Sequence, residues 1–119
     1  MKKILLVLFV VALLSACSLL NPDHTSQFFG TWSGSRSGSS GNATVTYTFN
    51  QNKTFSEITI DYIWGTTNLS GTWDADSQML KLLYSDGFFS QCSYVFSTFN
   101  GKAELQLTYS TATDFLVKQ

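Results

Sequence analysis

Few side chains in this 119-residue sequence could carry out catalysis. His24 is the single histidine, and it lies in the polar segment that precedes the first predicted strand. A serine or cysteine nucleophile inside the domain would therefore have no histidine beside it to act as a base. Cys92 has no basic neighbour in the sequence that would activate its thiol, so we interpret it as a small apolar strand residue.

The acidic residues do not combine into a site either. Glu57 and Asp61 fall on one strand face but lie about 13 Å apart at the rise of a β-strand. Glycoside hydrolysis needs two carboxyl groups about 5–9 Å apart. Asp74 and Asp76 begin like a calcium loop, but glutamine and methionine stand where such a loop needs a third acid and a glycine. We therefore expect a protein that is not an enzyme and that has neither a metal site nor a cofactor.

The clearest chemistry belongs to Cys17. It follows Met1-Lys2-Lys3 and an apolar run at 4–14, which is too short to span a bilayer, since that needs about 20 residues. The four residues Leu14-Ser15-Ala16-Cys17 resemble the lipobox of bacterial lipoproteins. The resemblance implies that residues 1–16 are removed as a signal peptide and that Cys17 carries long acyl chains as a membrane anchor. Ser18, in place of Asp, favours the outer membrane by the same resemblance.

Removing residues 1–16 leaves 103 residues, which form one small domain. Five basic and eight acidic side chains remain, so the formal net charge of this part is −3. Because it has no basic patch, we expect no nucleic-acid partner. Its many aromatic side chains can fill a core. With Cys17 acylated, Cys92 has no cysteine to pair with, so packing alone must hold the domain together.

After a tether at 17–27, short runs of alternating apolar and polar residues are separated by turn residues, with no helical period. Residues 33–42 are nearly all Gly and Ser and predict a flexible loop. Asp86-Gly87 and Asn100-Gly101 predict tight hairpins. The strands are expected at 28–33, 43–50, 54–64, 66–73, 78–84, 88–99, 103–109 and 114–118.

Eight such strands predict an all-β domain at 28–119, a small antiparallel up-and-down barrel, because closure removes the sheet edges. An open two-sheet sandwich is the alternative. In the third strand Phe55 is out of phase with Ile58, so a one-residue bulge is expected between them. The expected core includes Trp32, Tyr47, Phe49, Trp73, Leu82 and Leu105. The other inward residues are expected to be Ala43, Val45, Ile58, Ile60, Tyr62, Trp64, Leu69, Leu80, Tyr84, Cys92, Tyr94, Phe96, Leu107, Tyr109, Phe115 and Val117.

Four short motifs carry a resemblance to a family. They are Gly30-Thr31-Trp32, Tyr47-Thr48-Phe49-Asn50 with Thr54-Phe55 across a turn, Gly71-Thr72-Trp73, and Leu80-Lys81-Leu82. In this order and spacing they resemble the bacterial lipocalin-like lipoprotein domains over most of 28–109. The family's turn between the second and third strands holds Asp-Gly, whereas this chain has Gln51-Asn52-Lys53, so that hairpin is expected to differ. The resemblance implies a cup-shaped interior.

Two function classes follow. The first is a membrane-tethered binding module that holds a small, apolar, uncharged ligand, because the expected inward face offers no Arg or Lys to pair with a carboxylate. The Gly/Ser segment at 33–42 would then be a lid beside the ligand's path into the barrel. The second is a structural or protein-interaction envelope lipoprotein whose barrel interior is filled.

Overall fold

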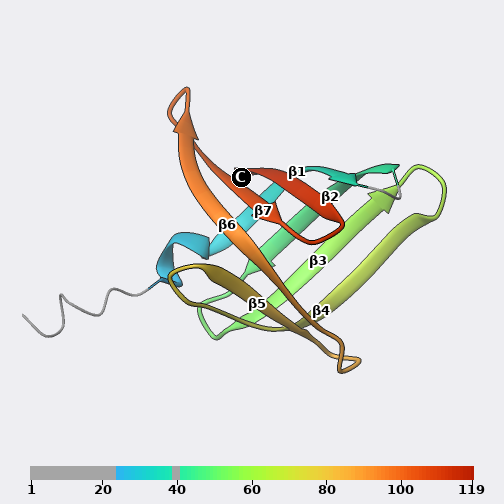
Figure 1. Cartoon of the computed structure of the whole chain (residues 1–119), viewed down its shortest axis with the longest axis horizontal. Helices are drawn as coiled ribbons and strands as arrows, with labels where there is room; N and C mark the ends of the chain where they lie inside the picture. Colours follow the sequence, from blue (N-terminus) through green and yellow to red (C-terminus); the bar gives the residue numbers. More distant parts are fainter. Residues whose placement is uncertain (1–23, 39–40) are drawn as a thin grey trace, which may run out of the picture.

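The computed structural model describes residues 24–38 and 41–119 and shows an all-β domain whose strands close into a barrel (Figure 1). Each strand pairs antiparallel with the next, and β1 pairs with β8 to complete the circle. The predicted eight-stranded up-and-down barrel is therefore confirmed, and the sandwich alternative is excluded. The strands are β1 (Gly30–Gly38), β2 (Gly41–Phe49), β3 (Thr54–Asp61), β4 (Gly65–Ala75), β5 (Met79–Tyr84), β6 (Phe89–Phe99), β7 (Lys102–Thr108) and β8 (Ala112–Lys118).

The two ends of the barrel differ. The β2–β3, β4–β5 and β6–β7 turns lie at one end, together with a short 3-10 turn, η1 (Ser26–Phe28). We call this the closed end. The β1–β2, β3–β4, β5–β6 and β7–β8 connections lie at the other, which we call the open end. Within the described residues, no helix has the length and the apolar character that crossing a bilayer requires.

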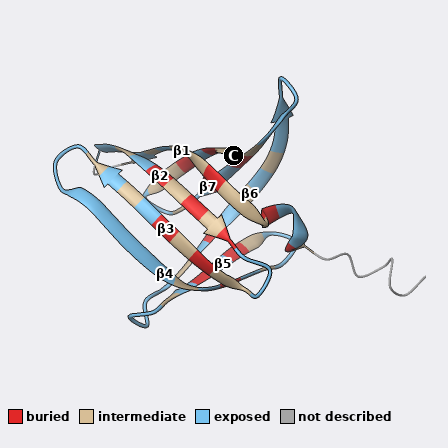
Figure 2. Ribbon diagram, turned by 180° about the vertical axis from the view of Figure 1, so that it is seen from behind, coloured by how far each residue is buried: buried red, intermediate tan, exposed pale blue. Residues whose placement is uncertain are grey.

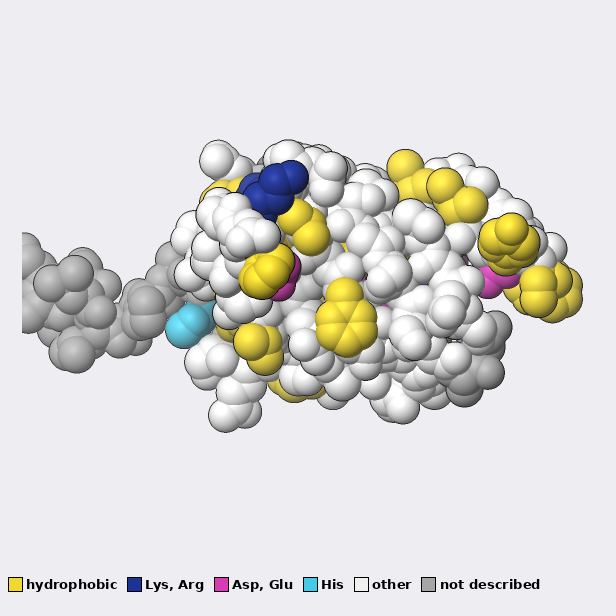
Figure 3. Space-filling view, turned by 90° about the horizontal axis from the view of Figure 1, so that it is seen from above, with side chains coloured by type: hydrophobic (Ala, Val, Ile, Leu, Met, Phe, Trp, Pro, Cys, Tyr) yellow, Lys and Arg dark blue, Asp and Glu magenta, His cyan; other side chains and the backbone are white. Residues whose placement is uncertain are grey.

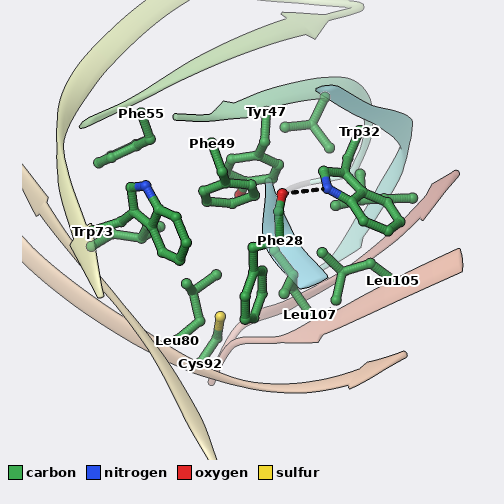
Figure 4. Close-up of a cluster of buried hydrophobic side chains, with 13 residues drawn as sticks. Phe28, Trp32, Tyr47, Phe49, Phe55, Trp73, Leu80, Cys92, Leu105 and Leu107 are labelled. Carbon is green, nitrogen blue, oxygen red and sulfur yellow. Dashed lines mark hydrogen bonds between the residues drawn. The ribbon is translucent and has the colours of Figure 1, made fainter. Parts of the chain in front are cut away.

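The Phe28 side chain fills the closed end of the barrel from inside. Its side chain is fully buried, and its ring centroid lies 4.8 Å from that of Phe96 and 5.5 Å from that of Trp73. Trp32 Nε1 donates a hydrogen bond of 2.8 Å to the Phe28 carbonyl, so the turn is held as well as packed (Figure 4). The sequence placed Phe28 in the first strand; it lies instead in η1, because the chain must fold back over the barrel opening to bury this ring.

The core lies in the closed half of the barrel. All six residues expected in it are buried, which confirms the alternation in most strands (Figure 2). Phe49 and Trp73 pack with ring centroids 5.1 Å apart, and Tyr47 stacks on Phe49 at 5.5 Å. The buried cluster consists of Phe28, Trp32, Val45, Tyr47, Phe49, Phe55, Trp73, Leu80, Leu82, Cys92, Leu105, Leu107 and Leu116.

The expected phase of β3 is wrong. Its register with β2 and β4 continues without a bulge, and the inward residues are Phe55 and Glu57. Ile58 and Ile60 are 39% and 52% exposed on the outer face, opposite Thr46 and Thr44 of β2. Phe55 packs in the core and fixes the phase, so the two-residue period carries the isoleucines outward.

Two further expectations at the ends of β3 and in β8 are also wrong. Tyr62 and Trp64 do not face inward, because β3 ends at Asp61 and both lie in the exposed β3–β4 turn. In β8 the sequence placed Phe115 and Val117 inside. The buried residues are Asp114 and Leu116, and Phe115 is 51% exposed.

Residues 33–38 and 41–42 lie in strands and not in the expected loop. β1 continues to Gly38 and β2 begins at Gly41, and the two strands pair along their whole length. β1 also pairs with β8 through the same segment. Small residues allow this close approach: a Cβ on Gly34 would lie 1.8 Å from the Phe115 carbonyl oxygen. The Gly/Ser composition therefore serves strand packing, and the proposed lid is wrong.

The predicted turns are confirmed. Asn100 and Gly101 both have positive φ, 51° and 76°, as a two-residue hairpin turn needs. In the turn that departs from the family pattern, Lys53 takes the left-handed conformation with φ 69°. The side chain of Asp76 accepts two backbone N–H bonds and forms a polar hairpin turn.

Candidate functional site

A group of polar side chains lies inside the barrel on the open-end side of the core. Arg36 on β1 and Asp114 on β8 are direct cross-strand partners on the inner face. Their ion pair is bidentate, with Nε to Oδ1 at 2.7 Å and Nη2 to Oδ2 at 2.9 Å. Asp114 is fully buried, whereas the Arg36 side chain is 25% exposed. The hydrogen bond to Asp114 raises the pKa of Arg36 above its ordinary value.

Two tyrosines extend this network across the barrel. The Tyr47 hydroxyl donates to Asp114 Oδ2 at 2.8 Å, accepts from Arg36 Nη2 at 2.8 Å, and lies 2.9 Å from the Tyr109 hydroxyl. Burial raises the pKa of both tyrosines well above the ordinary value. Burial also raises the pKa of the Cys92 thiol to about 12, so Cys92 is a neutral, buried residue, as the sequence indicated.

Glu57 is the second buried carboxyl group. It is 3% exposed, and its Oε1 accepts a hydrogen bond of 2.8 Å from the Tyr84 hydroxyl. Its Oε2 faces Arg36 Nη1 across 3.9 Å. Burial, and then the nearby Glu57 carboxylate, raise the pKa of Tyr84. In the described part of the chain, every buried side-chain nitrogen and oxygen has a hydrogen-bond partner.

Above this network the open end holds a hollow of about 340 Å³, which we call the cup. Arg36 and Glu57 are at its base, and Phe88, which is 64% exposed, stands at its rim. A larger hollow of about 680 Å³ is open to the side between β3–β4 and the β5–β6 turn, and its lining includes no charged side chain. The cup combines a concave surface with converging polar groups, which is typical of small-molecule sites. Its lining is Arg36, Glu57, Tyr84, Phe88, Ser90, Gln91, Tyr109, Ser110, Thr111 and Ala112.

The residues considered in the sequence have varied places. Cys17 and Ser18 lie outside the described residues, and His24 is at the start of the described chain. Asp61 does not line the cup; its Oδ1 accepts bonds from the backbone of Ile63 and Trp64 and shapes the β3–β4 turn. Among the described residues, no three His, Cys, Asp or Glu side chains come together as metal ligands would.

The inward-facing charges were missed, and the expectation of an interior without Arg or Lys is wrong. Arg36 lies in the Gly/Ser segment that was predicted to be a loop. Asp114 lies in β8, a strand for which Phe115 and Val117 were predicted to face inward instead. One signal could have found them. A single Arg among glycines and serines, and a single Asp directly before the apolar run Phe115-Leu116-Val117, each need a charged or polar partner if they lie on the inner face of a strand.

No protein-family model matches the sequence, and no curated protein is significantly similar to it. A comparison with solved structures finds a likeness to a lipocalin-like protein from Bacteroides uniformis. The two share 16% sequence identity and superpose with a TM-score of 0.51, over 77% of this chain and 98% of that one. The described domain therefore has a lipocalin-like fold.

Proposed function

We propose that this chain is a membrane-anchored cell-envelope lipoprotein that binds a small, uncharged ligand in the cup. The cup is the observation that carries the proposal. Below the cup, the described side chains of the buried cluster occupy the barrel interior, so a ligand would sit at the open end. A volume of about 340 Å³ lies within the range of small-molecule sites, about 300–1,000 Å³.

The polar base of the cup changes the expected chemistry of the ligand. A wholly apolar molecule would leave Arg36 and Glu57 desolvated without new partners, which is costly. A wholly polar one would gain nothing from the Phe88 ring at the rim. We therefore propose a ligand that is uncharged but has both an apolar part and hydrogen-bonding groups.

A second function, binding of a protein partner, is favoured by one observation. The β3–β4 turn exposes Tyr62, Ile63 and Trp64 by 101%, 77% and 81%. Figure 3 shows apolar side chains gathered on its right, the end where Figure 1 places the β3–β4 hairpin. Exposed aromatic residues of this kind are enriched at protein interfaces.

The test of the cup uses residues 24–119, which contain the whole buried cluster, and the uncharged fluorescent probe N-phenyl-1-naphthylamine. We expect saturable binding that Phe88→Ala weakens about tenfold, equivalent to about 1.4 kcal/mol. Phe89→Ala is the matched control, because Phe89 is the adjacent exposed Phe and does not line the cup. An absence of saturable binding, or an equal loss in both variants, would favour the protein-interaction function.

A further inference from the structure

At the base of the cup a guanidinium donor and a carboxylate acceptor face each other beyond hydrogen-bond distance. Arg36 uses Nε and Nη2 on Asp114 and Tyr47, which fixes the plane of its guanidinium. Glu57 Oε1 accepts from the Tyr84 hydroxyl at 2.8 Å, and Oε2 accepts a longer bond of 3.4 Å from the Thr59 hydroxyl. Arg36 Nη1 and Glu57 Oε2 are separated by 3.9 Å, which is longer than a hydrogen bond, at most about 3.2 Å for N–H···O. A carboxylate oxygen has two lone pairs, so Oε2 can accept a second hydrogen bond.

A hydroxyl oxygen fits this gap. If it lies to one side of the line that joins the two atoms, it can accept from Arg36 Nη1 and donate to Glu57 Oε2, with both bonds at about 2.8 Å. An ammonium group has no lone pair to accept from the guanidinium. A carboxylate has no proton to donate to Glu57. The geometry therefore selects a group that is both donor and acceptor.

The rest of the lining repeats this preference. Ser90, Ser110 and Thr111 border the hollow and carry hydroxyl groups, which also donate and accept. The rings of Tyr84, Phe88 and Tyr109 border the same hollow. Sugar rings and related polyols present hydroxyls at their edges and apolar C–H groups on their faces, so one molecule of this class can satisfy both kinds of lining.

The charges at the base disfavour an ionic ligand of either sign. Asp114 offsets Arg36, and Glu57 remains as a further buried carboxylate beside the cup. An anion in the gap would be repelled by Glu57, and a cation would be repelled by Arg36. A neutral ligand avoids both repulsions and the cost of desolvating a charge.

We infer that the ligand of the cup is a neutral, hydroxyl-rich molecule of the saccharide or polyol class, one of whose hydroxyls bridges Arg36 and Glu57. This inference rests on the proposed function of the cup and adds the chemical class of its ligand.

The test uses the full-length protein in lauryldimethylamine oxide, a detergent without a sugar headgroup, and saturation-transfer NMR. The probes are glucose, N-acetylglucosamine and maltose, which are neutral, with glucosamine and glucuronate as charged counterparts of the same ring. We expect saturable binding of at least one neutral sugar, with an affinity at least tenfold above those of glucosamine and glucuronate. Phe88→Ala should remove this binding, and Phe89→Ala should leave it unchanged.

Glu57→Gln gives a readout that a folding defect cannot imitate. The amide keeps the shape of the side chain and can still accept from Tyr84, but it removes the negative charge beside Arg36. We expect weaker binding of the neutral sugar and a gain of at least tenfold in affinity for glucuronate. If neutral sugars do not bind while glucosamine or N-phenyl-1-naphthylamine binds in a Phe88-dependent manner, the ligand class is wrong and the cup stands. If no probe binds in a Phe88-dependent manner, both the inferred ligand class and the proposed function of the cup are wrong.

Discussion

At the scale of single residues, the ion pair of Arg36 and Asp114 organises the polar interior. Asp114 is fully buried and accepts from both the guanidinium and the Tyr47 hydroxyl. A buried pair of this kind contributes little net stability compared with an apolar pair, yet breaking it is costly because it strands a charge. It joins β1, β2 and β8 at one point and so fixes their register.

Asp114→Asn is expected to lower the free energy of unfolding by about 2–3 kcal/mol. This is below the usual 3–5 kcal/mol for a broken buried pair, because Arg36 keeps part of its hydration. Chemical denaturation measured by intrinsic fluorescence would show it. Glu104→Gln is the control: it also removes one negative charge, from a residue whose one side-chain bond is 3.5 Å long and exposed. Equal effects of the two changes would contradict a structural role of the pair.

At the scale of the elements, the composition of β1 predicts a loop, but its packing between β2 and β8 makes it a strand. Its Gly and Ser residues would form a coil in isolation. In the barrel they let β1 approach β2 and β8 closely on its two sides. Gly71 has the same role in β4, where a Cβ would lie 2.0 Å from the Leu83 carbonyl oxygen.

Gly34→Ala is expected to destabilise the domain by at least about 1–3 kcal/mol, because the new methyl group overlaps the β8 backbone and cannot be relieved by a rotamer change. Thermal unfolding followed by circular dichroism measures this. Ser37→Ala, an exposed position of the same strand, should change stability by less than about 0.5 kcal/mol. A Gly34→Ala protein as stable as Ser37→Ala would mean that β1 does not pack against β8 as described.

At the scale of the whole molecule, the start of the described chain and the cup lie at opposite ends of the barrel. The described chain begins at His24, next to η1 at the closed end, and the cup opens at the other end (Figure 1). Six residues lie between Cys17 and His24 in the sequence, so the two are at most about 25 Å apart along an extended chain. An acylated Cys17 would therefore hold the closed end near the membrane and leave the cup directed away from it.

Cys17→Ala should abolish the incorporation of labelled fatty acid and release the protein from the membrane fraction, because Cys17 is the proposed site of acylation. Metabolic labelling and fractionation measure the two effects. Cys92→Ala is the matched control, since it removes the other cysteine and should leave labelling intact. Label that persists in the Cys17→Ala protein would refute the anchor.

The sequence by itself determined the fold class, the number of strands, most turns and six core residues. These depend on local rules: a two-residue alternation sets the two faces of a strand, and Asn-Gly adopts the backbone of a tight hairpin turn wherever it occurs. The resemblance carried by Gly30-Thr31-Trp32 and the related motifs agreed with the lipocalin-like fold.

The tertiary structure alone decided the phases of β3 and β8, the extent of β1 and the polar interior. Each of these depends on contacts between segments distant in sequence. The sequence around Ile58 predicts a core residue, but Phe55 pairs with Phe49 and so turns Ile58 outward. Asp114 is buried because it pairs with Arg36 of β1, 78 positions away in the sequence. Asp114 can be buried because the pairing of β1 with β8 places Arg36 opposite it. A local sequence pattern does not show which distant strand will supply such a partner.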